Sequence, residues 1–111
     1  MPYESENIKK LIIQWLEDKK AEEIVIIDLN DKSFIADYMI IATAQSSRQL
    51  YSIGDFLWSE LKKHNIFVHV EGKPPCDWVL VDAGFAIINL FKPESRSFYN
   101  LEKMWGLELP Q

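Results

Sequence analysis

Apolar and polar positions along the chain follow two different periods, and the first to appear is that of a helix. From Ser5 onward, apolar residues recur every three or four positions, which places them on one side of an α-helix. Ser5 suits the N-cap position, and Glu6 favours the positive end of the helix. Lys19 and Lys20 suit its last turn. The inward stripe consists of Ile8, Leu11, Ile12, Trp15 and Leu16.

A second helical pattern follows Ser46. Ser46 and Gln49 form a capping-box pair, which satisfies free backbone groups at a helix start. Gly54 costs roughly 1 kcal/mol in a helix interior relative to Ala, so it predicts close approach to a neighbouring backbone. Asn65 suits a left-handed end of this helix. The inward stripe consists of Leu50, Ile53, Leu57 and Leu61, with Trp58 beside it.

Five apolar runs are predicted to be strands. The first two form a hairpin, because the link between them is too short for a helical crossover. Gly84 can adopt a positive φ and therefore suits the turn of a second hairpin, which we place at the centre of the sheet. The runs are Ile24–Leu29, Tyr38–Thr43, Ile66–Val70, Trp78–Val81 and Phe85–Phe91.

The order of these elements predicts an α/β domain that borders on α+β. Residues 1–111 are expected to form one small domain with a mixed sheet of about five strands. Pro93 fits the first position of a short terminal helix. Several strands are apolar on both sides, and about three helices can hardly cover both faces of such a sheet. A partner or a second copy of the chain should therefore complete the cover.

Composition narrows the class of partner. The net charge of −5 disfavours broad nucleic-acid binding, which needs clustered Lys and Arg, and suits a basic protein instead. The single cysteine, Cys76, excludes an intrachain disulfide and suits a reducing compartment. The chain has neither an apolar run long enough to span a membrane nor a signal pattern at its start. These features predict a protein of the cytoplasm or of an organelle matrix.

Catalytic chemistry finds little support in the sequence. His64, His69 and Cys76 lack the spacing of a metal site, so we predict no metal and no cofactor. The acidic residues beside the strands are expected to end strands and cap turns rather than to hold a cation. Ser46-Ser47-Arg48 at a helix start could bind an anion, but helix capping is the favoured interpretation.

Aromatic residues gather in the carboxy-terminal third of the chain. Trp, Tyr, Met and Arg are enriched at the centres of protein interfaces, and Arg96 lies among these aromatics. The pattern alone is compatible with two interpretations, that they form an interface or that they are part of the core. The group consists of Trp78, Phe91, Phe98, Tyr99, Met104 and Trp105.

An ordered set of motifs resembles the Iojap-like ribosomal silencing factors (RsfS). The resemblance runs from about Ile8 to Trp105. Phe85 stands where the family commonly has Asp, and Asn89 where it often has His. The matching segments are Asp37-Tyr38, Ile41-Ala42-Thr43, Ser46-Ser47-Arg48-Gln49, Glu71-Gly72, Trp78-Val79-Leu80-Val81-Asp82-Ala83-Gly84, Phe91-Lys92-Pro93-Glu94 and Arg96 through Trp105.

The resemblance implies a nucleotidyltransferase-like fold without catalytic carboxylates, a homodimer and a cytoplasmic location. It implies that the protein binds large-subunit ribosomal protein uL14. This binding would block joining of the small and large subunits and so repress translation when nutrients are scarce. No enzymatic activity is expected. The alternatives are a nucleotidyltransferase-like enzyme that uses Ser46, Ser47 and Asp82, and an RNA-binding ribosome assembly factor.

The expected partner-binding surface serves the ribosomal protein, the dimer or both. By hypothesis, Trp78 and Tyr99 are its buried anchors, while acidic side chains meet basic groups of the partner. The residues assigned to it are Glu71, Trp78, Asp82, Phe91, Pro93, Glu94, Arg96, Tyr99, Leu101, Met104 and Trp105.

Overall fold

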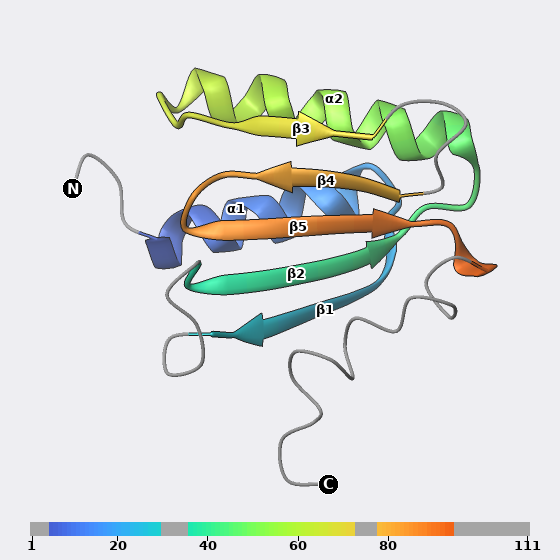
Figure 1. The fold of residues 1–111 in the computed structure, drawn as a ribbon, viewed down its shortest axis with the longest axis horizontal. Coiled ribbons are helices and arrows are strands. Elements are labelled where there is room, and N and C mark those ends of the chain that lie inside the picture. Colours follow the sequence, from blue (N-terminus) through green and yellow to red (C-terminus); the bar gives the residue numbers. More distant parts are fainter. Residues whose placement is uncertain (1–4, 30–35, 73–77, 95–111) are drawn as a thin grey trace, which may run out of the picture.

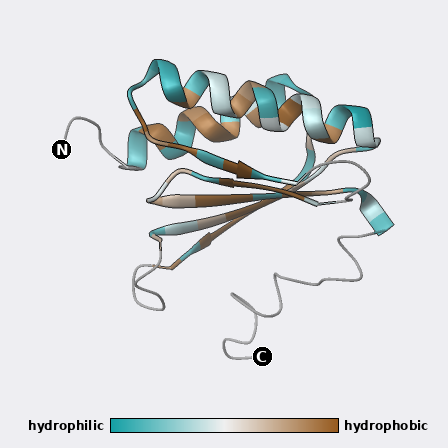
Figure 2. Cartoon of the chain, turned by 45° about the horizontal axis from the view of Figure 1, so that its top comes forward, coloured by the Kyte–Doolittle hydropathy of each residue, from teal (hydrophilic) through white to brown (hydrophobic). Residues whose placement is uncertain are grey.

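Two helices pack on one face of a five-stranded sheet in the computed structural model (Figure 1). The structure describes residues 5–29, 36–72 and 78–94. Apolar residues lie on the sides of the helices that meet the sheet, and polar residues lie on the outer sides of the helices (Figure 2). The elements are α1 (Ser5–Asp18), β1 (Glu22–Asp28), β2 (Tyr38–Thr43), α2 (Ser47–Lys63), β3 (His69–Glu71), β4 (Trp78–Asp82) and β5 (Ala86–Phe91).

The sheet is mixed and has the strand order β1-β2-β5-β4-β3. β2 and β5 run parallel, with Tyr38 opposite Ala86 and Thr43 opposite Phe91, and the other pairs are antiparallel. The predicted mixed sheet and its two hairpins are therefore confirmed. β5 is the central strand, and Gly84 turns the chain into it with φ of 87°.

Both helices end with the same backbone motif. After α1, Lys20 N–H donates to Glu17 and Ala21 N–H donates to Leu16, with Lys20 at φ of 68°. After α2, the same pattern recurs with Asn65 at φ of 61°. This is the Schellman motif, which satisfies carbonyls that a helix end leaves free. The left-handed Asn65 is confirmed, whereas Lys19 and Lys20 lie beyond α1, which begins at Ser5 and ends at Asp18.

The start of α2 is tied to the end of α1. Ser46 Oγ accepts a hydrogen bond from Gln49 N–H at 3.1 Å, which confirms the predicted cap. The Gln49 side chain accepts from Gln45 N–H at 2.7 Å and donates to the carbonyls of Lys19 and Lys20 at 3.1 and 3.2 Å. One side-chain amide therefore satisfies backbone groups just after α1 and just before α2.

The larger core lies between the helices and the sheet. Gly54 in α2 sits so close to β4 that an added Cβ would lie 3.0 Å from Val79 Cγ1. The predicted close approach is real, although the neighbour is a side chain rather than backbone. The largest fully buried residues of this core are Ile12, Leu16, Ile40, Leu50, Ile53, Leu57, Leu61, Ile88 and Leu90.

A second, smaller apolar cluster lies on the sheet face that points away from α1 and α2, which we call the far face. All six residues of β2 are buried, so this strand contributes to both clusters, as its continuous apolar run predicted. Within the described ranges, both helices lie on the opposite face (Figure 2). The far-face cluster consists of Ile27, Leu29, Met39, Ile41 and Phe91, with Val25, Trp78 and Ile87 packed against it.

The strand predicted at Ile66–Val70 is largely wrong, since β3 spans only His69–Glu71. β3 begins where its partner ends: His69 pairs with Asp82, and the turn at Ala83 and Gly84 follows. β1 also begins at Glu22, two residues before its predicted start, and it contains an irregularity between Glu22 and Val25. The terminal helix predicted from Pro93 lies mostly outside the described residues, although Pro93 and Glu94 are helical.

Candidate partner-binding surface

Trp78 is held in one orientation on the far face. Its indole stacks on Phe91 with ring centroids 5.4 Å apart, and its Nε1–H donates to Asn89 Oδ1 at 3.0 Å. Asn89 Nδ2 in turn donates to Met39 Sδ at 2.7 Å. Asn89 is only 1% exposed, so its amide holds the indole from within the sheet. Trp78 is half-buried and remains able to contact a partner.

Carboxylates flank this aromatic group on the side of β3. Side chains alternate along a strand, so Asp82 projects on the same side of β4 as Trp78. Asp82 Oδ1 accepts a hydrogen bond from Gly84 N–H at 2.9 Å. Glu71 is exposed on the edge strand, where its carboxylate lies 3.0 Å from His69 Nε2. The far face therefore combines an oriented indole with acidic groups.

The structure brings together only some of the predicted contact residues. Phe91 touches Trp78 but is 1% exposed, so it supports the indole from below. Pro93 and Glu94 are exposed just beyond the end of β5, and Glu94 lies 4.0 Å from Lys92 Nζ. The remaining predicted residues lie outside the described ranges. They are Arg96, Tyr99, Leu101, Met104 and Trp105.

Asn89 is the far-face residue whose role the sequence did not predict. It stood out only because it differs from the residue that the family often has at this position. An isolated Asn within an apolar strand is a signal in itself, since a buried amide needs hydrogen-bond partners. Trp78 and Met39 supply those partners.

Two groups that were weighed for anion or metal binding, Ser46 and His64, have structural partners. Ser46 Oγ caps α2, as the favoured interpretation predicted. His64 Nδ1 lies 3.0 Å from the Glu60 carbonyl, and its ring packs 5.5 Å from the Trp15 ring. Across residues 5–29, 36–72 and 78–94, His, Cys, Asp and Glu form no cluster of three or more that could hold a metal ion. In the same residues, no helix is long and apolar enough to cross a membrane.

Comparison with known proteins places this arrangement in a family. Residues 2–111 match the family model described as "Ribosomal silencing factor during starvation". The ribosomal silencing factor RsfS of Zymomonas mobilis is 50% identical over 105 residues, which are 94% of this chain and 79% of that protein. A mouse protein named "Mitochondrial assembly of ribosomal large subunit protein 1" is 33% identical over 101 residues, covering 87% of this chain and 44% of that protein.

The fold has a close counterpart among solved structures. A crystal structure of a protein from Chromobacterium violaceum has a TM-score of 0.88 and 33% sequence identity. The match covers 93% of this chain and 87% of that one. The likeness to nucleotidyltransferases stays a prediction. The model match along nearly the whole chain and the identity to named relatives show that this protein belongs to the ribosomal silencing factor family.

Proposed function

We propose that this protein silences translation by binding ribosomal protein uL14 on the large subunit and thereby blocking the small subunit from joining. The observation that supports this most is the Trp78–Asn89–Met39 arrangement. It presents an aromatic side chain in a fixed orientation on the same face as the carboxylates of Glu71 and Asp82, and such preorganisation lowers the entropy cost of binding. The mouse relative's name links that protein to the large ribosomal subunit.

The proposed mechanism is occupancy. A bound protein excludes the small subunit as long as it covers a surface that the small subunit must use, so no chemical turnover is needed. Trp78 would be the anchor, because buried Trp side chains dominate interface energetics. Glu71 and Asp82 would face basic groups and discourage binding to RNA phosphates. The protein would act in the cytoplasm as a homodimer and without enzymatic activity.

The test compares Trp78→Ala with Trp58→Ala. Trp58 is 45% exposed on α2, in the helical layer, and provides a matched loss of an indole away from the far face. Binding to purified large subunits is measured by co-sedimentation, and subunit joining by sucrose-gradient profiles. Loss of a true anchor should weaken binding by ~2 kcal/mol or more, about 30-fold.

Circular dichroism and thermal melting must first show that both variants are folded. Trp58→Ala should bind and block joining like the wild type. If folded Trp78→Ala retains wild-type affinity, or if joining proceeds normally with saturating wild-type protein, the proposal is wrong. Sedimentation equilibrium of the free protein tests the homodimer separately.

A further inference from the structure

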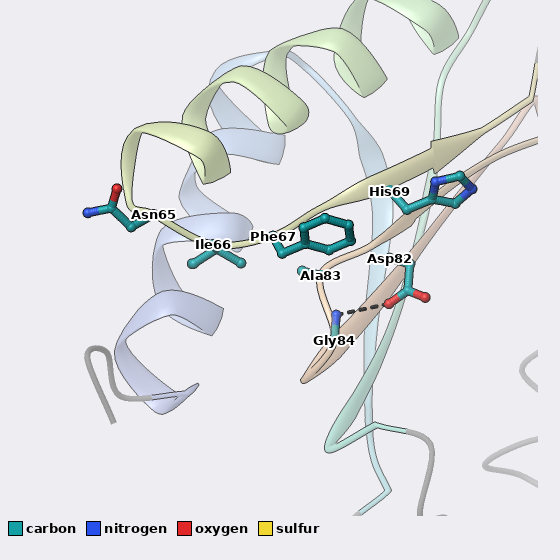
Figure 3. Close-up of a pocket in the computed structure, with 7 residues that line it drawn as sticks. All are labelled: Asn65, Ile66, Phe67, His69, Asp82, Ala83 and Gly84. Atoms are coloured by element: carbon teal, nitrogen blue, oxygen red, sulfur yellow. Dashed lines mark hydrogen bonds between the residues drawn. The ribbon is translucent and has the colours of Figure 1, made fainter.

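A pocket of about 380 Å³ opens where β3 begins and β4 ends, beside the turn at Ala83 and Gly84 (Figure 3). Its walls come from three places in the sequence: the turn that follows α2 at Asn65, the segment that leads into β3, and the turn at Ala83 and Gly84. Phe67 and Asp82 both line it. The apolar pattern places Phe67 inside a strand and therefore does not indicate this pocket.

Phe67 is 86% exposed, the highest value among the large apolar residues that the structure describes. Its neighbours explain the exposure. Ile66 and Val68 are 3% and 7% exposed and hold this segment against the core, so Phe67 must point the other way. The orientation of the ring therefore follows from packing on both sides of it. A phenyl ring exposed in this way offers its π face to a ligand.

Asp82 supplies a charged group in the same pocket. Its Oδ1 is engaged by Gly84 N–H at 2.9 Å, which restrains the carboxylate (Figure 3). A Cβ added at Gly84 would meet no atom within 4 Å, so space is free above this turn. His69 of β3 also lines the pocket, and its ring is paired at 3.0 Å with the carboxylate of Glu71, which lies outside the lining. Negative charge and an exposed aromatic ring thus share one opening.

We propose that this pocket receives an arginine side chain from the protein partner of the far face. A guanidinium group is flat, stacks on aromatic rings, and donates two parallel hydrogen bonds to a carboxylate. Phe67 would provide the stacking surface and Asp82 the carboxylate. Lysine fits less well, because its ammonium is strongly hydrated and cannot stack. The net charge of −5 favours the approach of such a cationic group.

The position of the pocket connects it to the proposed function, on which the identity of the partner rests. Trp78 and Asp82 lie at the two ends of β4 and project on the same side. The four residue-to-residue steps between them span ~13 Å along a strand. A partner seated on Trp78 would therefore reach the pocket along one strand, and the arginine would fix the register of the complex.

The first experiment tests the pocket without the ribosome. The folded protein is titrated with acetyl-Gly-Arg-Gly-amide and, as an uncharged isostere, with the same peptide containing citrulline, while amide NMR signals are followed. We expect shifts at Phe67, Asp82 and Gly84 with the arginine peptide, and their loss in Phe67→Ala. Equal shifts with citrulline, or none with arginine, would overturn the proposal.

The second experiment measures large-subunit affinity for Phe67→Ala, Asp82→Asn and the double variant. Phe67 is exposed and Asn can still accept from Gly84 N–H, so both changes should preserve the fold. Each should weaken binding about fivefold to tenfold. The double variant should lose less than the product of the two factors, because both residues hold one group. Phe67→Trp should bind like the wild type, as should the control Trp58→Ala.

The results separate this inference from the proposed function. If the wild type does not bind the large subunit, the function fails, and the peptide titration alone judges the pocket. If the wild type binds and Phe67→Ala binds equally well, the function stands and the pocket assignment fails. Should Phe67→Ala instead lose affinity for single-stranded RNA while the arginine peptide is inert, the ring stacks on bases and the proposal is wrong.

Discussion

Asn89 shows how one buried polar residue can organise an apolar surface. Its oxygen accepts from the Trp78 indole, and its nitrogen donates to the Met39 sulfur. A buried amide is costly unless both of its ends are satisfied. The sheet meets this requirement with residues from three adjacent strands, β4, β5 and β2. The amide therefore determines the orientation of the indole as well as the packing of the sheet.

Asn89→Ala removes the acceptor that the Trp78 N–H uses and leaves a small void. We expect a loss of about 1–3 kcal/mol in the free energy of unfolding, measured by urea denaturation. The matched control is Gln14→Ala, which deletes an exposed amide that donates to Asp18 on α1. That change should stay within about 0.5 kcal/mol. Equal effects of the two substitutions would contradict the role assigned to Asn89.

Tyr38 links the sheet to α1 through its hydroxyl, which donates to Glu6 Oε1 at 2.8 Å. Lys9 Nζ donates to the other Glu6 oxygen at 3.0 Å and lies 4.7 Å from the centre of the Tyr38 ring. The hydrogen bond to Glu6, together with burial, raises the pKa of Tyr38 from 10.0 to about 12. The folded protein thus holds the phenolic proton more tightly than the unfolded chain.

This difference predicts a pH dependence in alkaline solution. The stabilisation that comes from the protonated Tyr38 hydroxyl is complete below 10.0, the pKa of Tyr38 in the unfolded chain. It is lost as the pH rises towards about 12, the pKa of Tyr38 in the folded protein. Tyr38→Phe lacks this titration, so its melting temperature should fall less than that of the wild type across the interval. Thermal melts of both proteins from pH ~9 to ~12 check this. If the melting temperatures of the two proteins fall by the same amount over this interval, the prediction is wrong.

At the scale of elements, the contact between α2 and β4 sets the spacing between the helical layer and the sheet. Gly54 lets the helix approach Val79 to a distance at which an added Cβ would be 3.0 Å from the Val79 side chain. Such tight interiors tolerate little added volume. The interior glycine that weakens the helix is therefore matched by closer packing between the layers.

Gly54→Leu should destabilise the protein by about 1–3 kcal/mol, because the added side chain pushes α2 away from β4. Ser52→Leu places the same side chain at an exposed position of the same helix and should have little effect. Chemical denaturation measures both. Shortening the neighbour in Gly54→Leu/Val79→Ala should cost less than the sum of the two single changes. An additive result would show that the two residues are not in conflict.

The sequence predicted elements best where one pattern determined them. β2 was predicted residue for residue, because a continuous apolar run between two buried faces leaves no other choice. β3 was overextended, since Ile66 and Val68 are buried by packing and not by strand pairing, which stops at Asp82. The end of α1 was missed because a left-handed Lys20 has no compositional signal.

The sequence predicted the candidate surface only in part. The sequence identified Trp78, Asp82 and Glu71 by residue type and motif. It could not show that Asn89 holds the indole, or that Phe67 and Asp82 line one pocket. Both depend on contacts between strands and segments whose register is set only in the folded sheet. Residue type indicates what a side chain can do, and topology decides which side chains meet.

For the whole molecule, the net charge of −5 governs association with a basic partner. If the partner is a protein, higher salt should slow association with the large subunit but change the dissociation rate much less. Stopped-flow or surface-based kinetics from about 0.05 to 0.5 M salt measures this. A steep loss of affinity as the salt concentration rises, together with competition by free ribosomal RNA, would favour the RNA-binding alternative.

The parallel pairing of β2 with β5 has a consequence for biosynthesis. β5 joins the two halves of the sheet and is the last strand of the described residues. It pairs with β2, which lies about fifty positions earlier in the sequence. While synthesis has not yet passed Phe91, the amino-terminal hairpin has no central strand to dock against. The first half of the nascent polypeptide must therefore wait for Phe91 to leave the ribosome before the two sides of the sheet can be joined.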